Sequence, residues 1–131
     1  MSTVLLDASV ILAAFDRDDR CHEAAAALLA DDSIALATID LARYEVVNVA
    51  IRAWSAPEVV GPLLSALGRI EDDGGVLESS GTLIARAAEL AQSHEIAVYD
   101  AAYVAAAEQA DRTLVSCDIR DLVAKGLARL P

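Results

Sequence analysis

The sequence has few of the residues that hold small secreted or metal-stapled proteins together. Cys21 and Cys117 are the only two cysteines in 131 residues, which is too few for a disulfide framework. Cys21 precedes His22, but no second pair of cysteine or histidine residues completes a zinc site. Two histidines in an otherwise featureless setting also give no basis for a Ser/His/Asp triad.

Long hydrophobic runs are also missing from the sequence. No segment gives the unbroken stretch of about 18 apolar residues that a membrane-spanning helix needs. No charged leader precedes the first apolar run, so the N-terminus does not resemble a signal peptide. We therefore predict a cytoplasmic protein with no membrane partner.

Aromatic and basic residues are scarce as well. Aromatics make up 4% of a chain that is 56% hydrophobic, so the core must be built from Ala, Leu, Val and Ile. The 10 basic and 21 acidic residues give a net charge of −11. Such a surface repels nucleic acid, so any chemistry on nucleic acid would need bound cations or local basic patches. Solubility alone also explains an acidic surface.

Short apolar runs that alternate with helical segments predict an α/β fold. The length fits one domain, residues 1–131. The run Thr3–Leu6 reads as a buried parallel strand that ends at Asp7. The other expected strands are Ile34–Thr38, Val76–Leu77, Thr113–Ser116 and an edge strand within Leu127–Leu130. We predict a parallel sheet of four to five strands flanked by helices.

Helical segments are expected between these strands. A kink or a break into two short helices is expected at Gly61-Pro62, and Ser55 is expected to cap that segment. The predicted helices are Ala8–Phe15, His22–Ala30, Leu41–Trp54, a segment from Ser55 to Ile70, Thr82–Ser93, one from about Asp100 to Ala110, and Ile119–Gly126.

Two aspartates follow predicted strands. Asp7 comes after Val4–Leu6, and Asp118 comes shortly after Thr113–Ser116. Open α/β sheets carry their functional sites at the carboxyl ends of the strands, which favours a shared site for this pair. A simpler interpretation of Asp7 is a helix cap, which alone would explain its position.

Two further acids stand in apolar helical surroundings. Glu45 shares a helix face with Leu41 and Val49, and a Glu on an apolar stripe is seldom buried without a partner. Asp100 is the only charged residue between positions 97 and 107. Solvent exposure of Glu45 and a capping role for Asp100 are the simpler interpretations. Ser9 and Ser116 each lie two residues from an aspartate and can orient carboxylates or metal-bound water.

Several carboxylates in one place predict a bound cation. Like charges raise one another's pKa and destabilise the fold, so a cluster persists at neutral pH mainly when a cation occupies it. Oxygen-only ligands suit Mg²⁺ or Mn²⁺. Such ions hold phosphates and lower the pKa of bound water, which favours hydrolysis of a phosphodiester.

Four blocks of the sequence resemble the PIN-domain family, and the compact length is similar to that of the VapC toxins of VapBC toxin–antitoxin pairs. The blocks are VLLDASVI, RYEVVN, AVYDAAYVAAAE and TLVSCDIRDL, and together they span nearly the whole chain. The third block is the most specific. The resemblance implies a parallel sheet flanked by helices and an Mg²⁺- or Mn²⁺-dependent endoribonuclease.

The resemblance also implies site residues and partners. The family's acidic residues, which are its catalytic residues and metal ligands, fall on Asp7, Glu45, Asp100 and Asp118. Its small hydroxyl residues fall on Ser9 and Ser116, where the second position is often Thr in the family. Asp121 is a further acid that we place at the periphery. The implied partners are an RNA substrate, a second copy of the chain in a homodimer, and a cognate VapB-like antitoxin.

Basic residues that can touch an RNA backbone are not ranked by the sequence. They include Arg17, Arg20, Arg43, Arg86, Arg112 and Arg120.

Other functions that gather acids at strand ends fit less well. A receiver domain would need a central Asp after the third strand, where Glu78-Ser79 stand, and a late Lys, whereas Lys125 lies within the last helix. An Asp-x-Asp phosphatase would need Asp at position 9, which is Ser. A dinucleotide-binding protein would need a glycine-rich turn after the first strand, and the sequence has none there. The main alternative is a catalytically silent PIN-like module that binds RNA or a protein partner without cutting RNA.

Overall fold

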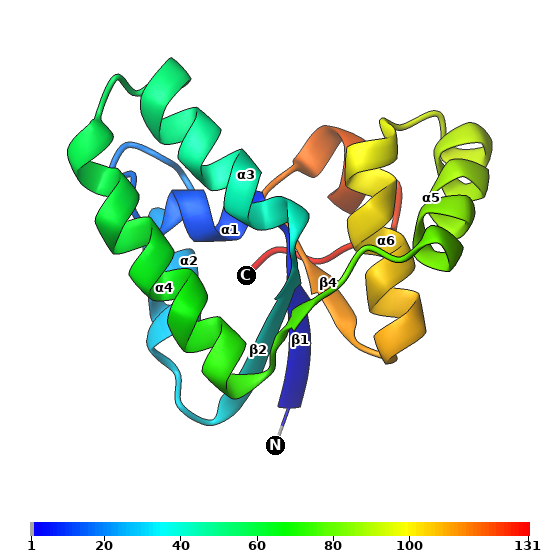
Figure 1. Cartoon of the computed structure of the whole chain (residues 1–131), viewed down its shortest axis with the longest axis horizontal. Coiled ribbons are helices and arrows are strands. Elements are labelled where there is room, and N and C mark those ends of the chain that lie inside the picture. The colour runs from blue at the N-terminus through cyan, green and yellow to red at the C-terminus, as the bar shows by residue number, and fades with distance from the viewer. Residues whose placement is uncertain (1) are drawn as a thin grey trace.

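Four parallel strands form the centre of the protein (Figure 1). The computed structural model describes residues 2–131, and its strands are β1 (Ser2–Leu6), β2 (Ile34–Ile39), β3 (Val76–Leu77) and β4 (Thr113–Val115). They lie in the order β3-β2-β1-β4, and every neighbouring pair is parallel. The predicted parallel α/β sheet is therefore confirmed.

The sheet has four strands rather than five. The segment expected as an edge strand, Leu127–Leu130, forms only an isolated parallel bridge between Arg129 and Val115. This segment extends the hydrogen bonding beyond β4, because the N–H of Ser116 donates to the carbonyl of Arg129 at 2.9 Å.

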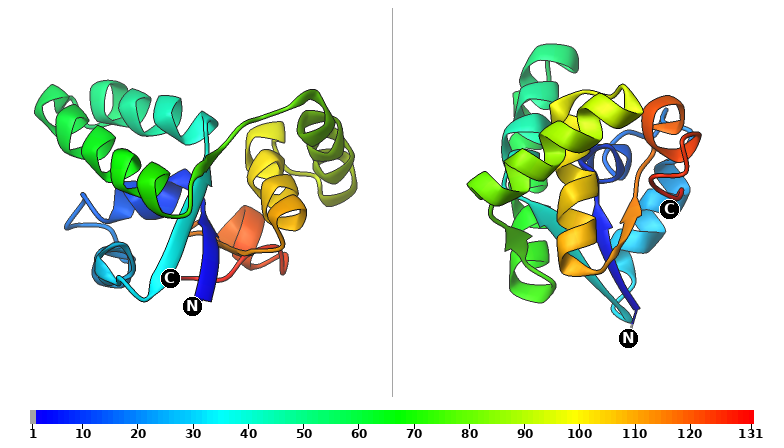
Figure 2. Two further views of the ribbon diagram at one scale, coloured as in Figure 1. Left: turned by 60° about the horizontal axis from the view of Figure 1, so that its bottom comes forward. Right: turned by 90° about the vertical axis from the view of Figure 1, so that its right-hand side faces the viewer.

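Helices cover both faces of this sheet (Figures 1 and 2). α1 packs on β1 and α4 on β2 and β3, whereas α6 packs on β1, β2 and β4 and is covered in turn by α5. None of the helices within residues 2–131 is both long enough and apolar enough to cross a membrane. The helical elements are α1 (Ala8–Ala13), α2 (His22–Ala30), α3 (Leu41–Asn48), η1 (Val49–Ala53), η2 (Pro57–Val59), α4 (Val60–Asp73), α5 (Gly81–His94), α6 (Val98–Ala110) and η3 (Ile119–Val123).

α6 carries the longest unbroken run of buried residues among the helices of residues 2–131. Its residues from Ala101 to Ala107 are all buried, and Tyr103 among them is fully buried. The run of alanines explains this, because small side chains let the helix approach both the sheet and α5 closely. A helix that is apolar on all sides is typical of a protein core. Asp100 lies one turn from the start of this helix, so a buried scaffold holds its position.

Two helical segments differ from their predicted form. The expected helix Leu41–Trp54 changes at Val49 from α to π geometry, which forms η1. The expected interruption at Gly61-Pro62 is wrong, because α4 runs unbroken from Val60 to Asp73. Pro62 lies in the first turn of α4, where backbone N–H groups have no partner within the helix. Ser55 is not the cap of this segment, because Ala56 precedes η2.

The chain path changes direction at β1. The connection from β1 leads to β2 on one side, whereas β4 pairs with the other side of β1. Open parallel sheets form a crevice at such a switch point, at the carboxyl ends of the two strands. Asp7 follows β1 and Asp118 follows β4, so both lie at the carboxyl edge of the sheet beside this switch point.

Candidate active site

The first aspartate of the site lies in a buried network of hydroxyl groups. One carboxylate oxygen of Asp7 accepts hydrogen bonds from the hydroxyls of Ser9 at 2.6 Å and Ser116 at 2.9 Å. The two hydroxyls are themselves 3.3 Å apart. Asp7 is only 6% exposed and Ser116 is fully buried. The network joins the end of β1 to the end of β4.

Asp7 does not act as the helix cap that its position suggested. It occupies the residue before α1, but its side chain makes no capping hydrogen bond, and its partner in the first turn is the hydroxyl of Ser9. Burial raises the pKa of Asp7, and the hydrogen bonds from Ser9 and Ser116 offset only part of that rise. An acid that is costly to ionise in a buried place is a common feature of functional sites.

The same hydroxyls fix the backbone that follows β4. The N–H of Cys117 donates to the Ser9 hydroxyl at 2.9 Å, and the N–H of Asp118 donates to the Ser116 hydroxyl at 2.9 Å. Asp118 then caps η3, because its carboxylate accepts the N–H of Asp121 at 3.0 Å. The hydrogen bonds therefore run without a break from Asp7 to Asp121.

Three carboxylates come together near the carboxyl ends of β1 and β4. Asp100, Asp118 and Asp121 each offer an oxygen, and these oxygens all lie within 4.8 Å of one another. Burial and then the negative charges of Asp7, Asp118 and the other acids raise the pKa of Asp100 to about 6. Asp100 lies within α6 and not at its cap position, which is Ala97.

Glu45 reaches the site from the opposite side, on α3. Its carboxylate accepts a hydrogen bond from the hydroxyl of Tyr103 at 2.7 Å. Burial raises the pKa of Glu45, the bond from Tyr103 acts in the opposite direction, and the charge of Asp7 adds to the rise. Glu45 is therefore half-buried and partnered, not freely exposed on a rotated stripe.

The structure brings the predicted acids to one region but not into one ligand group. Asp100 and Asp118 share the cluster with Asp121, which the sequence analysis placed at the periphery. Among residues 2–131, Asp7 and Glu45 lie outside the three-carboxylate group. The charge of Asp7 nevertheless raises the pKa of both Glu45 and Asp100, which places all of these acids in one electrostatic field.

Sequence reasoning missed one residue of the site, Tyr103, and placed another, Asp121, at the periphery. Tyr103 was treated only as part of a motif, although it lies three residues after Asp100 and so projects from the same side of α6. Asp121 lies three residues after Asp118, which is the spacing of a capping interaction across one helical turn. In both cases, the feature of the sequence that could have identified the residue was its spacing of three residues from a candidate acid.

The arrangement suits a hard divalent cation. The clustered donors are all carboxylate oxygens, and such donors bind Mg²⁺ or Mn²⁺ in preference to softer metals. Burial is the first cause of the raised pKa of Asp100, and the neighbouring negative charges that add to this rise are the charges that a bound cation would offset.

A family comparison covers most of the chain. The PIN domain family model matches residues 4–126. The chain belongs to the PIN-domain family. This match includes both strand ends, α3 and α6, and hence every acid of the site described above. No curated protein sequence matches the chain.

Solved structures share this PIN fold at low sequence identity. VapC20 of Mycobacterium tuberculosis, a sarcin–ricin loop cleaving toxin, superposes with a TM-score of 0.67 and 18% identity over 86% of each chain. VapBC2 of Rickettsia felis, bound to a promoter DNA fragment, superposes with a TM-score of 0.64 and 16% identity over 98% of this chain and 97% of that chain. A toxin–antitoxin complex of Klebsiella pneumoniae superposes with a TM-score of 0.62 and 19% identity over 90% of this chain and 88% of that chain.

Proposed function

We propose that this chain is a single PIN domain that acts as a metal-dependent endoribonuclease in the cytoplasm. The observation that carries the proposal is the group of carboxylate oxygens from Asp100, Asp118 and Asp121 within 4.8 Å of one another at the carboxyl edge of the sheet. A protein with a net charge of −11 has little other means of holding a polyanion at an acidic site.

The acidic residues are proposed to hold Mg²⁺ or Mn²⁺. Asp100 and Asp118 are the central ligands, with Asp121 beside them and Asp7 and Glu45 completing the acidic surroundings. When bound, the cation would neutralise the scissile phosphate and lower the pKa of water at the site.

The protein's own groups position the centre and handle protons. The hydroxyls of Ser9 and Ser116 hold the Asp7 carboxylate and fix the backbone N–H groups that follow β4. Glu45 is held by Tyr103 and carries a raised pKa, which suits a carboxylate that accepts a proton from attacking water. Both serine hydroxyls are engaged in the network, so water rather than a side chain is the proposed nucleophile.

The biological role is proposed by analogy with the structural relatives. One is described as a toxin that cleaves the sarcin–ricin loop, and others are toxin–antitoxin complexes. We propose that this chain is a toxin that hydrolyses RNA, forms a homodimer and is neutralised by a cognate VapB-like antitoxin.

Cleavage of a mixed RNA pool by the purified chain tests the proposal. We expect discrete products with Mg²⁺ or Mn²⁺, no products with EDTA, and loss of cleavage in Asp100→Asn. Asp72→Asn is the matched control, because Asp72 is an exposed acid on α4 outside the cluster. Thermal melts of both variants establish that they fold.

Two outcomes would overturn the proposal. Cleavage that survives both EDTA and Asp100→Asn would point to a contaminating nuclease. Metal binding by calorimetry without cleavage of any RNA would favour the alternative, a catalytically silent module that binds RNA or a protein partner.

A further inference from the structure

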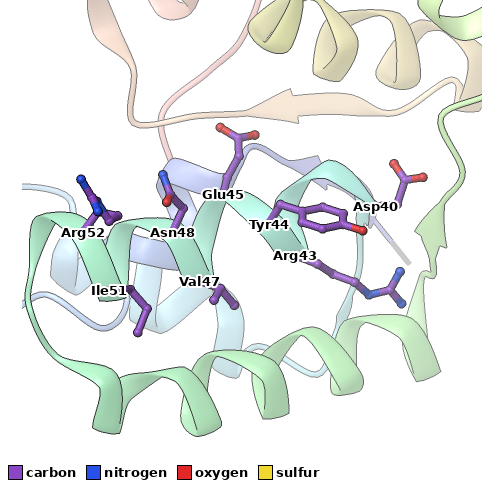
Figure 3. A pocket seen from close by; sticks show the side chains of 8 residues that line it. All are labelled: Asp40, Arg43, Tyr44, Glu45, Val47, Asn48, Ile51 and Arg52. Atoms are coloured by element: carbon purple, nitrogen blue, oxygen red, sulfur yellow. The ribbon is translucent and has the colours of Figure 1, made fainter.

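A groove of about 910 Å³ runs along α3 and η1 past Glu45, an acid of the candidate active site (Figure 3). Beside Glu45, its lining combines guanidinium, amide and aromatic groups with aliphatic side chains and one further carboxylate. The other lining residues are Asp40, Arg43, Tyr44, Val47, Asn48, Ile51 and Arg52.

Three of these side chains form a stripe on one face of the helix. Figure 3 shows Glu45, Asn48 and Arg52 projecting from the same side, whereas Val47 and Ile51 project toward the opposite side. The spacing of three and four residues explains this alignment. The stripe spans two turns, or about 10 Å along the helix axis.

The change to π geometry falls within this stripe. In η1 the N–H of Trp54 bonds to the carbonyl of Val49, five residues back, at 2.9 Å. Single π turns within α-helices occur frequently at functional sites. Arg52 lies on this turn and is exposed.

Arg52 differs from the other arginine of the groove in its electrostatic partners. Arg43 pairs with Glu71 at 3.2 Å, so a carboxylate already compensates its charge. Among residues 2–131, Arg52 makes no ion pair. A guanidinium that makes no ion pair and lies beside an acidic centre is suited to bind a phosphate.

Tyr44 lies on the other side of Glu45 from Arg52 (Figure 3). Its side chain is 77% exposed, although burial of an aromatic ring is strongly favourable. Proteins bind single-stranded nucleic acid by stacking bases on exposed aromatic rings and by pairing cations with the backbone. Tyr44 and Arg52 offer these two contacts at opposite ends of the groove.

We propose that this groove is the track for a single RNA strand, with a base stacked on Tyr44 and a backbone phosphate bound by Arg52. Asn48, between them, offers an amide to the ribose hydroxyls or base edges. This proposal rests on the proposed function for its choice of nucleic acid. A stacked strand advances about 3.4 Å per nucleotide, so Arg52 binds a phosphate about three nucleotides from the bond held at Glu45.

Binding of a fluorescein-labelled oligouridylate of about 15 nucleotides tests the track by anisotropy. Measurements are made with Mg²⁺ over a series of salt concentrations, before detectable cleavage, and gels of the same samples report cutting. Arg52→Ala is expected to weaken binding about tenfold and to lower the salt slope by about 0.7, the value for one phosphate contact on a single strand. Arg52→Lys keeps the charge and should retain the slope.

Arg69→Ala is the matched control for the charge change. Arg69 is also an exposed helical arginine without an ion pair among residues 2–131, but it lines a cavity with Ile34 and Leu36, toward the opposite edge of the sheet. Tyr44→Ala should weaken binding about fivefold or more, whereas Tyr44→Phe keeps the ring and should bind as the wild type does.

The outcomes separate this inference from the proposed function. Equal effects of Arg52→Ala and Arg69→Ala, or no RNA binding by the wild type, would overturn the track. Binding that depends on Arg52 and Tyr44 without any cutting by the wild type would support the track and overturn the nuclease.

Discussion

The ends of β1 and β4 carry the same pattern, an apolar strand followed by an aspartate, yet the two aspartates occupy different environments. Asp7 is 6% exposed, and two serine hydroxyls donate to its carboxylate. Asp118 is half-buried, caps η3 and shares a carboxylate cluster with Asp100 and Asp121. The strand end brings an acid to the edge of the sheet, and the local burial decides whether that acid joins the buried hydroxyl network or the more open carboxylate cluster.

Ser116 joins these two environments. Its hydroxyl donates to Asp7 and accepts from the N–H of Asp118, so the buried acid and the cluster acid share one partner. Removal of the Ser116 hydroxyl therefore breaks the hydrogen-bonded path from Asp7 to Asp118 without removing either carboxylate, whereas the path through Ser9 to Cys117 remains.

The largest effect that we expect from this comparison is a loss of RNA cleavage in the Ser116→Ala variant. Loss of the groups that orient metal ligands typically costs about 10- to 100-fold in activity or metal affinity, and we expect a loss in this range. Ser116→Thr keeps the hydroxyl and should recover most of the activity. Metal affinity by calorimetry should fall in parallel, which a purely structural role in the core would not produce.

Ser33→Ala is the control for this prediction. The Ser33 hydroxyl also donates to an aspartate, Asp31, at 2.6 Å, but on the exposed surface. Cleavage and metal affinity should be unchanged in this variant. Equal losses in the two serine variants, or none in Ser116→Ala, would refute the linking role.

A second, intermediate effect concerns the stability of the metal-free protein. The folded chain keeps a proton on Asp100 up to about pH 6, and the pKa of Asp7 is also raised, whereas the unfolded chain releases these protons near their ordinary values. The folded state thus binds more protons, so stability falls as the pH rises from about 4 to about 7. Melting temperatures in EDTA should show this fall, and Mg²⁺ should reduce it.

The two strand ends should differ in this pH dependence. Asp7→Asn removes a buried titrating acid and the charge that contributes most, after burial, to the raised pKa of Asp100. Asp118→Asn removes a smaller contribution to the same shift. We expect the pH dependence to flatten more in Asp7→Asn than in Asp118→Asn. The reverse order would contradict the assignment of Asp7 as the buried anchor.

Much of this architecture follows from simple patterns in the sequence. The runs before Asp7 and before Asp118 predicted parallel strands because short apolar segments rich in β-formers fit a sheet that is covered on both faces. The predicted helix His22–Ala30 agrees with α2. Its two ends were recognisable because a polar loop precedes it and an Asp-Asp-Ser segment follows it. Local composition carried enough information for these elements.

Other features depended on contacts that the sequence does not display. The sequence made Asp7 a plausible helix cap, but its carboxylate accepts a hydrogen bond from Ser116, which is 109 residues away in the chain. The break expected at Gly61-Pro62 is absent because a proline in the first helical turn costs no hydrogen bond. Arg52 was not among the arginines considered, although its spacing of seven residues from Glu45 predicts the same helix face; the groove that both residues line is visible only in the structure.

The smallest effect that we expect concerns Glu45, which like Asp118 is half-buried but whose carboxylate is held by a tyrosine hydroxyl. Burial and the Glu45 carboxylate raise the pKa of Tyr103, so its hydroxyl stays protonated and donates to Glu45. Tyr103→Phe removes the bond that lowers the pKa of Glu45, so that pKa should rise further. The acid limb of the pH–rate profile for RNA cleavage should then move to higher pH, with the rate at alkaline pH nearly unchanged. A uniform loss of rate at every pH would instead assign Tyr103 a packing role in α6.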